Sequence, residues 1–261
     1  MIKGEWLPVK TRIYTILEIA FIALFIFSCC KLIGMLSDYN KGDNIYKESR
    51  EEFTKKTEPK KGVFGLDFEI DLEKLNKENS DVIGWIYIKD TPVNYPLLID
   101  DNNDYYLKHT YNNIYSDFGS IFIDSRCSGD FEDANTIIYG HNTKNGSMFG
   151  SLKKYKSVDY RNEHPYVYII KPDMAYKFEV VSAQTVTTDN SVYTLNFASD
   201  SEHEKWYESV LNGSEFTAET SDFNKNDKTI TLSTCTTGNE NERFVVVARL
   251  ADTVINRDTN Q

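Results

Sequence analysis

The chain is poor in cysteine. Two of its four cysteines, Cys29 and Cys30, lie inside a long apolar run, which leaves only Cys127 and Cys235 in the rest of the 261 residues. Two cysteines are too few for the disulfide framework that small secreted domains use, so we expect both to be free thiols. Cys127 lies in a polar stretch and is interpreted as an incidental loop residue. Cys235 is therefore the candidate for chemistry.

The sequence also lacks the ligand sets of common metal sites and an excess of basic residues. No paired cysteines or closely spaced histidines supply a zinc site. Residues 100–104 match the opening of a calcium loop, but Tyr105 stands where glycine is needed and Tyr111 where glutamate is needed. The chain has 29 Lys and Arg against 40 Asp and Glu, and its net charge of −11 opposes binding to a phosphate backbone. We expect no metal, no cofactor and no nucleic-acid partner.

A long apolar run is present near the N-terminus. Residues 13–36 are almost continuously apolar, and a helix of this length, at about 1.5 Å per residue, crosses a hydrocarbon layer of roughly 30 Å. Because Lys3, Lys10 and Arg12 precede the run, the positive-inside rule predicts that residues 1–12 are cytoplasmic and the remainder extracellular. The sequence thus predicts a single-pass protein of the cell membrane.

A cleaved signal peptide is the alternative interpretation of this run. No small-x-small cleavage site follows it, and the run is long for the apolar region of a signal peptide. Residues 26–29 resemble a lipoprotein processing site, although the bulky Phe27 stands where a small residue is usual. Either outcome would still leave an extracellular domain tethered to the membrane.

The chain beyond the apolar run divides into a charged segment and one domain. Residues 37–62 are dense in charge and poor in large apolar residues, so we expect a tether or an appended helix that contributes little core. Residues 63–261 have the apolar density and length of a single domain, without an internal repeat.

Strand-like runs dominate this domain. Runs rich in β-branched and aromatic residues are found at 85–88, 93–98, 120–124, 136–139, 166–170, 176–186, 229–235 and 244–250. Helical patterns are fewer and are found at residues 71–77, 149–155 and 201–211. Many strands with few helices favour a closed or nearly closed β-barrel.

Cys235 ends one of the most β-prone runs, and Arg243 begins the next one after a turn-rich connection. The two strands are expected to pair as an antiparallel hairpin, with Cys235 and Arg243 at one loop mouth. A thiol with an ordinary pKa of about 8.5 needs a base or an ion-pairing partner to act as a nucleophile. Among the four histidines, His141 has the most suggestive position, because it follows the strand-like residues 136–140 and precedes a polar loop.

Three short motifs resemble those of a known family. Tyr139-Gly-His-Asn142, Thr231-Leu-Ser-Thr-Cys235 and Arg243-Phe-Val-Val246 are similar to the histidine, cysteine and arginine motifs of sortases, in the family's order. Further stretches resemble the class B branch in particular, and the likeness covers roughly residues 64–250. These stretches are Asn79–Ile86, Asp104–Leu107, Gly119–Asp124 and Met148–Phe149.

The resemblance implies both a fold and an activity. The implied fold is mainly β, a closed eight-stranded barrel with peripheral helices, preceded here by one N-terminal transmembrane helix. A helix at residues 201–211 would belong to the insertion that distinguishes class B. The implied activity is that of a Gram-positive cysteine transpeptidase, which cuts the C-terminal sorting signal of a secreted surface protein. The new carboxyl end is then joined to an amine of the peptidoglycan or of its lipid-linked precursor.

The resemblance also assigns roles to residues. Cys235 would attack the scissile carbonyl to give a thioester, and His141 would protonate the leaving amine and later deprotonate the incoming one. Arg243 would stabilise the oxyanion or hold peptide carbonyls, because its guanidinium stays charged. Tyr139 and Asn142 would orient His141. The residues implied to line the peptide groove are Asn103, Leu107, Ser233 and Thr234.

Two other functions stay open at this point. A membrane-tethered cysteine endopeptidase would form the same thioester and use water as the acceptor. A non-catalytic peptide-binding barrel would not need Cys235, and the complete set of Cys235, His141 and Arg243 argues against it. Neither the sorting signal nor the acceptor amine can be read from the residues.

Overall fold

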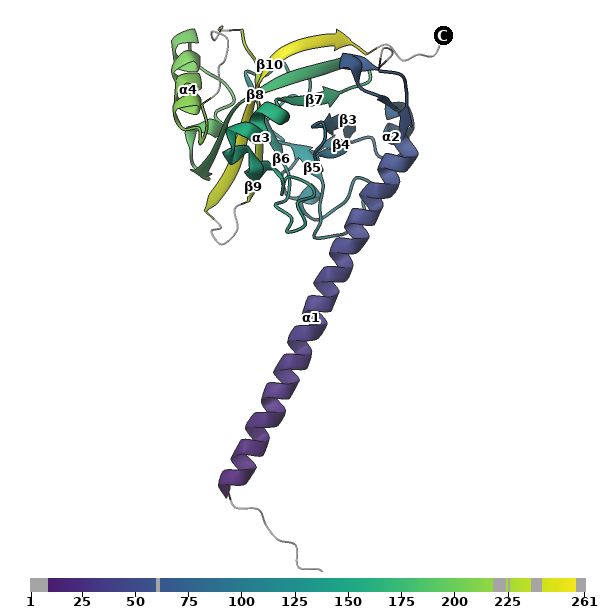
Figure 1. Cartoon of the computed structure of the whole chain (residues 1–261), viewed down its shortest axis with the longest axis vertical. Helices are drawn as coiled ribbons and strands as arrows, with labels where there is room; N and C mark the ends of the chain where they lie inside the picture. The colour runs from purple at the N-terminus through teal and green to yellow at the C-terminus, as the bar shows by residue number, and fades with distance from the viewer. Residues whose placement is uncertain (1–8, 60–61, 218–223, 225, 236–240, 257–261) are drawn as a thin grey trace, which may run out of the picture. The chain divides into compact units, whose positions relative to one another are not determined.

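The computed structural model describes residues 9–59, 62–217, 224, 226–235 and 241–256 (Figure 1). The chain divides into two compact units between Lys41 and Gly42. Helix α1 (Val9–Phe53) contains the predicted apolar run, and the large apolar side chains from Ile13 to Leu36 are exposed. By its length and composition α1 could cross a membrane, a property that signal sequences share.

The last turns of α1, Gly42–Phe53, belong to the second unit. Ile45, Tyr46, Ser49 and Phe53 are buried there, so the expectation that this charged stretch contributes little core was wrong. The four side chains recur at helical spacing and therefore share one face of the helix. Four well-spaced residues build a buried face that average composition does not reveal.

A closed barrel forms the centre of the second unit. Within the described residues its eight strands follow the order β10-β8-β7-β3-β4-β5-β6-β9, and β9 pairs with β10 to close the ring. This confirms the predicted eight-stranded barrel. The strands are β3 (Val82–Tyr87), β4 (Asn94–Ile99), β5 (Ile121–Ile123), β6 (Asn135–Tyr139), β7 (Tyr166–Ile170), β8 (Met174–Thr187), β9 (Thr229–Cys235) and β10 (Glu242–Ile255).

Most neighbouring strands are antiparallel, but β4–β5 and β6–β9 are parallel pairs. The predicted run 244–250 is longer in the structure, because β10 continues to Ile255 along β8. Two short strands that the pattern did not predict, β1 (Thr54–Lys56) and β2 (Phe68–Ile70), form a separate antiparallel pair. Each has three residues, which is too short to show an alternating pattern.

Helices and single turns surround the barrel. The three predicted helical patterns correspond to α2 (Leu72–Glu78), which Asp71 caps, to the 3-10 turn η3 (Leu152–Lys156) and to α4 (Asp200–Asn212). Figure 1 shows α4 beside β8. Its buried face, with Trp206, Tyr207 and Val210, packs against valines of β8 and β10. The remaining elements are α3 (Val158–Glu163) and the turns η1 (Val63–Gly65), η2 (Tyr105–Leu107) and η4 (Ser191–Tyr193).

Candidate active site

The ends of three strands meet at one edge of the barrel. Because β6 and β9 run parallel with Tyr139 opposite Ser233, both chains leave the sheet on the same side, toward His141 and Cys235 respectively. The hydrogen bond from Gly140 N to Ser233 O, at 3.1 Å, extends this pairing to the residue before the histidine. On the other side of β9, Arg243 of β10 lies opposite Cys235 in the antiparallel register. The predicted hairpin is therefore present.

Cys235 is described as the last residue of β9, and its side chain lies outside the described part of the structure. The connection at residues 236–240 lies outside it as well. The backbone register nevertheless fixes the neighbours of Cys235 in the sheet, which are Arg243 on one side and the end of β6 on the other.

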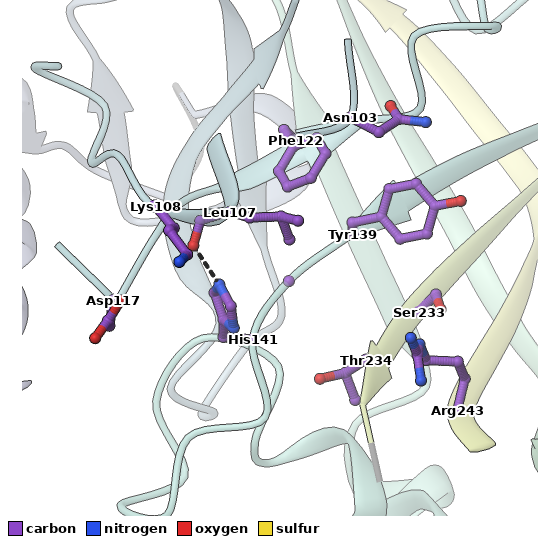
Figure 2. A pocket seen from close by; sticks show the side chains of 11 residues that line it. Asn103, Leu107, Lys108, Asp117, Phe122, Tyr139, His141, Ser233, Thr234 and Arg243 are labelled. Atoms are coloured by element: carbon purple, nitrogen blue, oxygen red, sulfur yellow. Dashed lines mark hydrogen bonds between the residues drawn. The ribbon is translucent and has the colours of Figure 1, made fainter. Parts of the chain in front are cut away.

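A pocket of about 490 Å³ opens at this edge (Figure 2). Figure 2 shows His141 and Leu107 on one side of it and Ser233 and Arg243 on the other. Seven of the residues singled out in the sequence line this pocket, whereas Asn142 does not, and its backbone instead pairs with Met148. Among the described residues the lining consists of Asn103, Leu107, Lys108, Asp117, Phe122, Tyr139, Gly140, His141, Ser233, Thr234 and Arg243.

The ring of His141 is held in one tautomer. Its Nε2 lies 2.7 Å from the carbonyl oxygen of Leu107, and because a carbonyl only accepts, Nε2 must carry the hydrogen. In the neutral ring Nδ1 is then the nitrogen that can accept a proton. Burial lowers the pKa of His141 below its ordinary value, although the Leu107 carbonyl and the charge of Asp117 act in the opposite direction. The neutral form, able to act as a base, is therefore favoured.

Gly119 lies directly against the His141 ring. A Cβ atom at this position would be 2.7 Å from the imidazole Cδ2 and 2.8 Å from both Nε2 and the Leu107 carbonyl. Its φ of +60° is also in the left-handed region that side chains rarely adopt. Both the space and the backbone conformation thus require glycine beside the histidine.

Ser233 and Thr234 supply hydroxyl groups to the opposite wall of the pocket. Ser233 Oγ lies 2.8 Å from the Tyr193 hydroxyl, which ties the end of β9 to the turn η4. Thr234 is 4% exposed, and its Oγ1 has no hydrogen-bond partner within the described residues. A buried hydroxyl without a partner is costly, so a ligand atom that bonded it would gain affinity.

One turn at the end of β5 holds two further pocket residues. Asn103 Oδ1 accepts a 2.8 Å hydrogen bond from Ser125 N, which leaves the amide N–H groups as donors for a ligand. Tyr139 donates its hydroxyl to Asp124 Oδ2 at 2.8 Å. Asp124 is fully buried and forms a two-bond ion pair with Arg126 at 2.8 and 2.9 Å.

The Asp124 carboxylate stays ionised. Burial acts to raise its pKa, but the hydrogen bonds and charge of Arg126 outweigh burial and lower the pKa to about 2. The carboxylate therefore acts as a permanent acceptor for Tyr139.

Sequence reasoning missed several residues of this site. Phe122 and Asp124 lie within Gly119–Asp124, one of the stretches that resemble class B. That resemblance was the signal that could have identified them. Asp117 and Lys108 lie close to such stretches, outside them, and were not singled out. Tyr193 carried no signal, because its contact with Ser233 joins segments 40 positions apart.

Cys127 is a free and buried thiol. Burial raises its pKa to about 11, so it is a poor nucleophile near neutral pH. This fits the prediction that Cys127 is not part of the chemistry.

Comparison with known proteins decides the family. The protein-family model that describes the sortase domain matches residues 86–251 of this chain. Over 248 residues the chain is 35% identical to sortase B of Listeria monocytogenes, covering 94% of this chain and 99% of that protein. The chain belongs to the sortase B family. It is accordingly a cysteine transpeptidase by family.

Solved structures of sortase B share the fold. A structure from B. anthracis has 30% identity and a TM-score of 0.71, and the match covers 84% of this chain and 100% of that one. A complex of Staphylococcus aureus sortase B with a substrate has 30% identity and a TM-score of 0.65, with 69% of this chain and 84% of that chain covered. These matches, over 69% to 84% of this chain, confirm the sortase fold.

Proposed function

We propose that this sortase B cleaves a C-terminal sorting signal of secreted proteins through a thioester on Cys235 and transfers them to an amine of the cell-wall peptidoglycan. The observation that carries the proposal is the register of β9, which sets Cys235 opposite Arg243 while the parallel strand β6 leads to His141. The pocket at this edge supports it, because it contains a base, a cation and several hydrogen-bond donors.

The first half of the reaction forms the thioester. His141 Nδ1 accepts the proton of the Cys235 thiol, and the sulfur attacks the scissile carbonyl carbon. Arg243 donates to the oxyanion that develops on the carbonyl oxygen. The C–N bond then breaks, and the leaving amine takes the proton from His141 Nδ1. The bond from Nε2 to Leu107 favours this role, because it keeps the other ring nitrogen available for the proton.

The second half transfers the acyl group. An amine of the wall peptide attacks the thioester carbon, gives a proton to His141 Nδ1 and displaces the Cys235 thiolate, which recovers that proton. The new C–N bond replaces the C–S bond, so no energy source or cofactor is needed. A neutral His141 is ready to accept the proton of either incoming nucleophile, consistent with its lowered pKa.

The other pocket residues are proposed to bind the sorting signal. Asn103 and Thr234 offer hydrogen-bond groups without other side-chain partners among the described residues, and Ser233 is held by Tyr193. Leu107, 39% exposed, offers an apolar contact. Tyr139 forms part of the wall, and Asn142, outside the pocket, is proposed to act only through the loop that follows His141. The S. aureus relative has been solved as a substrate complex, which supports a substrate site on this fold.

We further propose that residues 13–36 cross the membrane, with residues 1–12 in the cytoplasm and the catalytic domain at residues 63–261 outside the cell. Residues 37–62 lie between them in the chain, and of these Gly42–Phe53 is packed into the second unit. The flanking Lys3, Lys10 and Arg12 favour this orientation.

Mass spectrometry of the full-length protein in detergent tests the proposal. The protein is incubated with a library of sorting-signal peptides, with and without an amine acceptor, alongside Cys235→Ala. The expected result is cleavage that requires Cys235, a trapped adduct on that residue and an amine-linked product. If the amount of hydrolysed peptide stays the same when amine is added, the protein is an endopeptidase. Absence of any adduct or cleavage would contradict the proposed reaction.

A further inference from the structure

One continuous segment backs the His141 ring. Leu107 supplies the carbonyl that accepts from Nε2, Asp117 supplies a nearby charge, and Gly119 lies against the ring face. All three belong to residues 107–120, named here the backing segment. The position and tautomer of His141 therefore depend on how firmly this segment is held from behind.

Tyr46, in the last turns of α1, holds the backing segment from that side. Its hydroxyl lies 2.7 Å from the Gly119 carbonyl, to which it donates, and 2.8 Å from Ser120 Oγ. It also accepts from Tyr111 N at 3.3 Å. Ser120 Oγ in turn donates to the His109 carbonyl at 2.7 Å. The Tyr46 hydroxyl thus joins Tyr111, in the first half of the backing segment, to Gly119 and Ser120 at its end.

The environment of Tyr46 keeps that hydroxyl in place. The residue is fully buried, and its ring contacts Tyr95, Tyr111 and Phe118 at centroid distances of 5.2 to 5.8 Å. Gly42 allows the helix to approach this closely, because a Cβ there would lie 2.5 Å from Phe118. A buried phenol that satisfies backbone groups 65 and 73 positions away is well suited to fixing a loop.

We propose that Tyr46 is a positioning residue for His141. By fixing the Gly119 carbonyl and the Tyr111 amide, it holds the Leu107 carbonyl against Nε2 and so directs Nδ1 toward the thiol side of the site. The inference rests on the proposed function only in giving His141 a catalytic role. The geometry of the histidine can be measured without any substrate.

The test is hydrogen–deuterium exchange at the Cε1 atom of each histidine, followed by mass spectrometry of the full-length protein in detergent across a range of pH. The method reports the pKa and the exchange rate of each ring separately. In Tyr46→Phe the pKa of His141 should rise toward its ordinary value, since burial is the main cause of its lowering, and its exchange should accelerate several-fold. His203, on α4, serves as the internal reference.

Tyr155→Phe is the matched control. Tyr155 is also buried and donates to a backbone carbonyl, that of His164, at 2.7 Å, but neither residue lines the pocket. This variant should lose a similar amount of stability and leave the exchange curve of His141 unchanged. An unchanged curve in a folded Tyr46→Phe protein would overturn the proposal. If Tyr46→Phe does not fold, Ser120→Ala removes one partner of the Tyr46 hydroxyl and its link to the His109 carbonyl, and it should shift the His141 curve in the same direction by a smaller amount.

An activity assay adds a second readout. Tyr46→Phe should lower kcat by on the order of tenfold at nearly constant KM, because a misplaced acid–base group loses part of its contribution to the rate. Tyr155→Phe should keep wild-type kcat. If the wild-type protein cleaves no peptide, the proposed function fails, whereas the exchange experiment still decides the role of Tyr46.

Discussion

At the scale of single residues, the contact between Gly119 and His141 allows a sharp test. Gly119→Ala would set a methyl group less than 3 Å from the imidazole ring. We expect the ring to move and kcat/KM to fall by about 100-fold, the loss that a displacement near 1 Å can cause. Activity assays and thermal unfolding measure the two effects.

Gly146→Ala is the control for Gly119→Ala. Gly146 also has a positive φ, +81°, but nothing lies within 4 Å of its added Cβ. Both variants incur a backbone cost of roughly 1–2 kcal/mol, and only Gly119→Ala should lose activity. Equal activity in the two variants would mean that the close contact does not constrain His141.

The buried carboxylate of Asp124 yields a prediction with a pH dependence. Its pKa falls from an ordinary 3.8 to about 2 in the folded protein, so ionisation contributes about 2 kcal/mol of stability above pH 4. That contribution is lost as the pH falls through 2, because the folded carboxylate then becomes protonated as well. Asp124→Asn should therefore be less stable than wild type by about 2 kcal/mol at pH 7 and by much less near pH 2.

Denaturant unfolding at several pH values measures the difference between Asp124→Asn and wild type. The same variant should raise KM, because Tyr139 loses its charged acceptor at the pocket wall. A stability difference that stays constant down to pH 2 would show that the carboxylate charge is not its source.

At the scale of elements, the end of α1 is predicted to be part of the fold. A chain that begins at Gly42 keeps the buried face of the helix, whereas one that begins at Thr54 loses Tyr46, Ser49 and Phe53. Loss of one large buried side chain costs about 3–5 kcal/mol, and domains have only about 5–15 kcal/mol in total. Circular dichroism should show cooperative melting for the longer chain and little folded structure for the shorter one. Equal melting temperatures would contradict this.

The strands were largely predictable from the sequence, whereas the buried face of α1 and the long-range contacts around the site were not. β7 and β9 begin and end at the predicted residues, because runs such as Thr229–Cys235 combine β-branched residues with clear turn signals. The buried face of α1 was underestimated: Ile45, Ser49 and Phe53 recur at helical spacing, but Ser49 is not apolar and the stripe is thin. The motif residues His141 and Arg243 were found from local sequence. Gly119, Asp124 and Tyr193 act through contacts between distant segments, which no local pattern encodes.

At the scale of the whole molecule, the orientation in the membrane is the main prediction. Residues 13–36 should remain in the mature protein, so its intact mass should correspond to the uncleaved chain. Protease added to intact cells should digest the barrel, because the basic residues before the span favour a cytoplasmic N-terminus. A mass that lacks the N-terminal residues would indicate processing at a signal sequence. Protection of the barrel from protease would indicate the reverse orientation.

The parallel pairing of β6 with β9 also links the proposed chemistry to completion of the barrel. His141 and Cys235 come from strands 94 positions apart in the chain, with Asn135 paired to Thr229, and they share an edge only after the ring of strands has closed. Bringing residues so distant in the chain together costs loop-closure entropy, which the contacts of the closed barrel must offset. Until the barrel closes, the proposed thiol and its proposed base are therefore apart, so the proposed reaction requires the complete ring of strands.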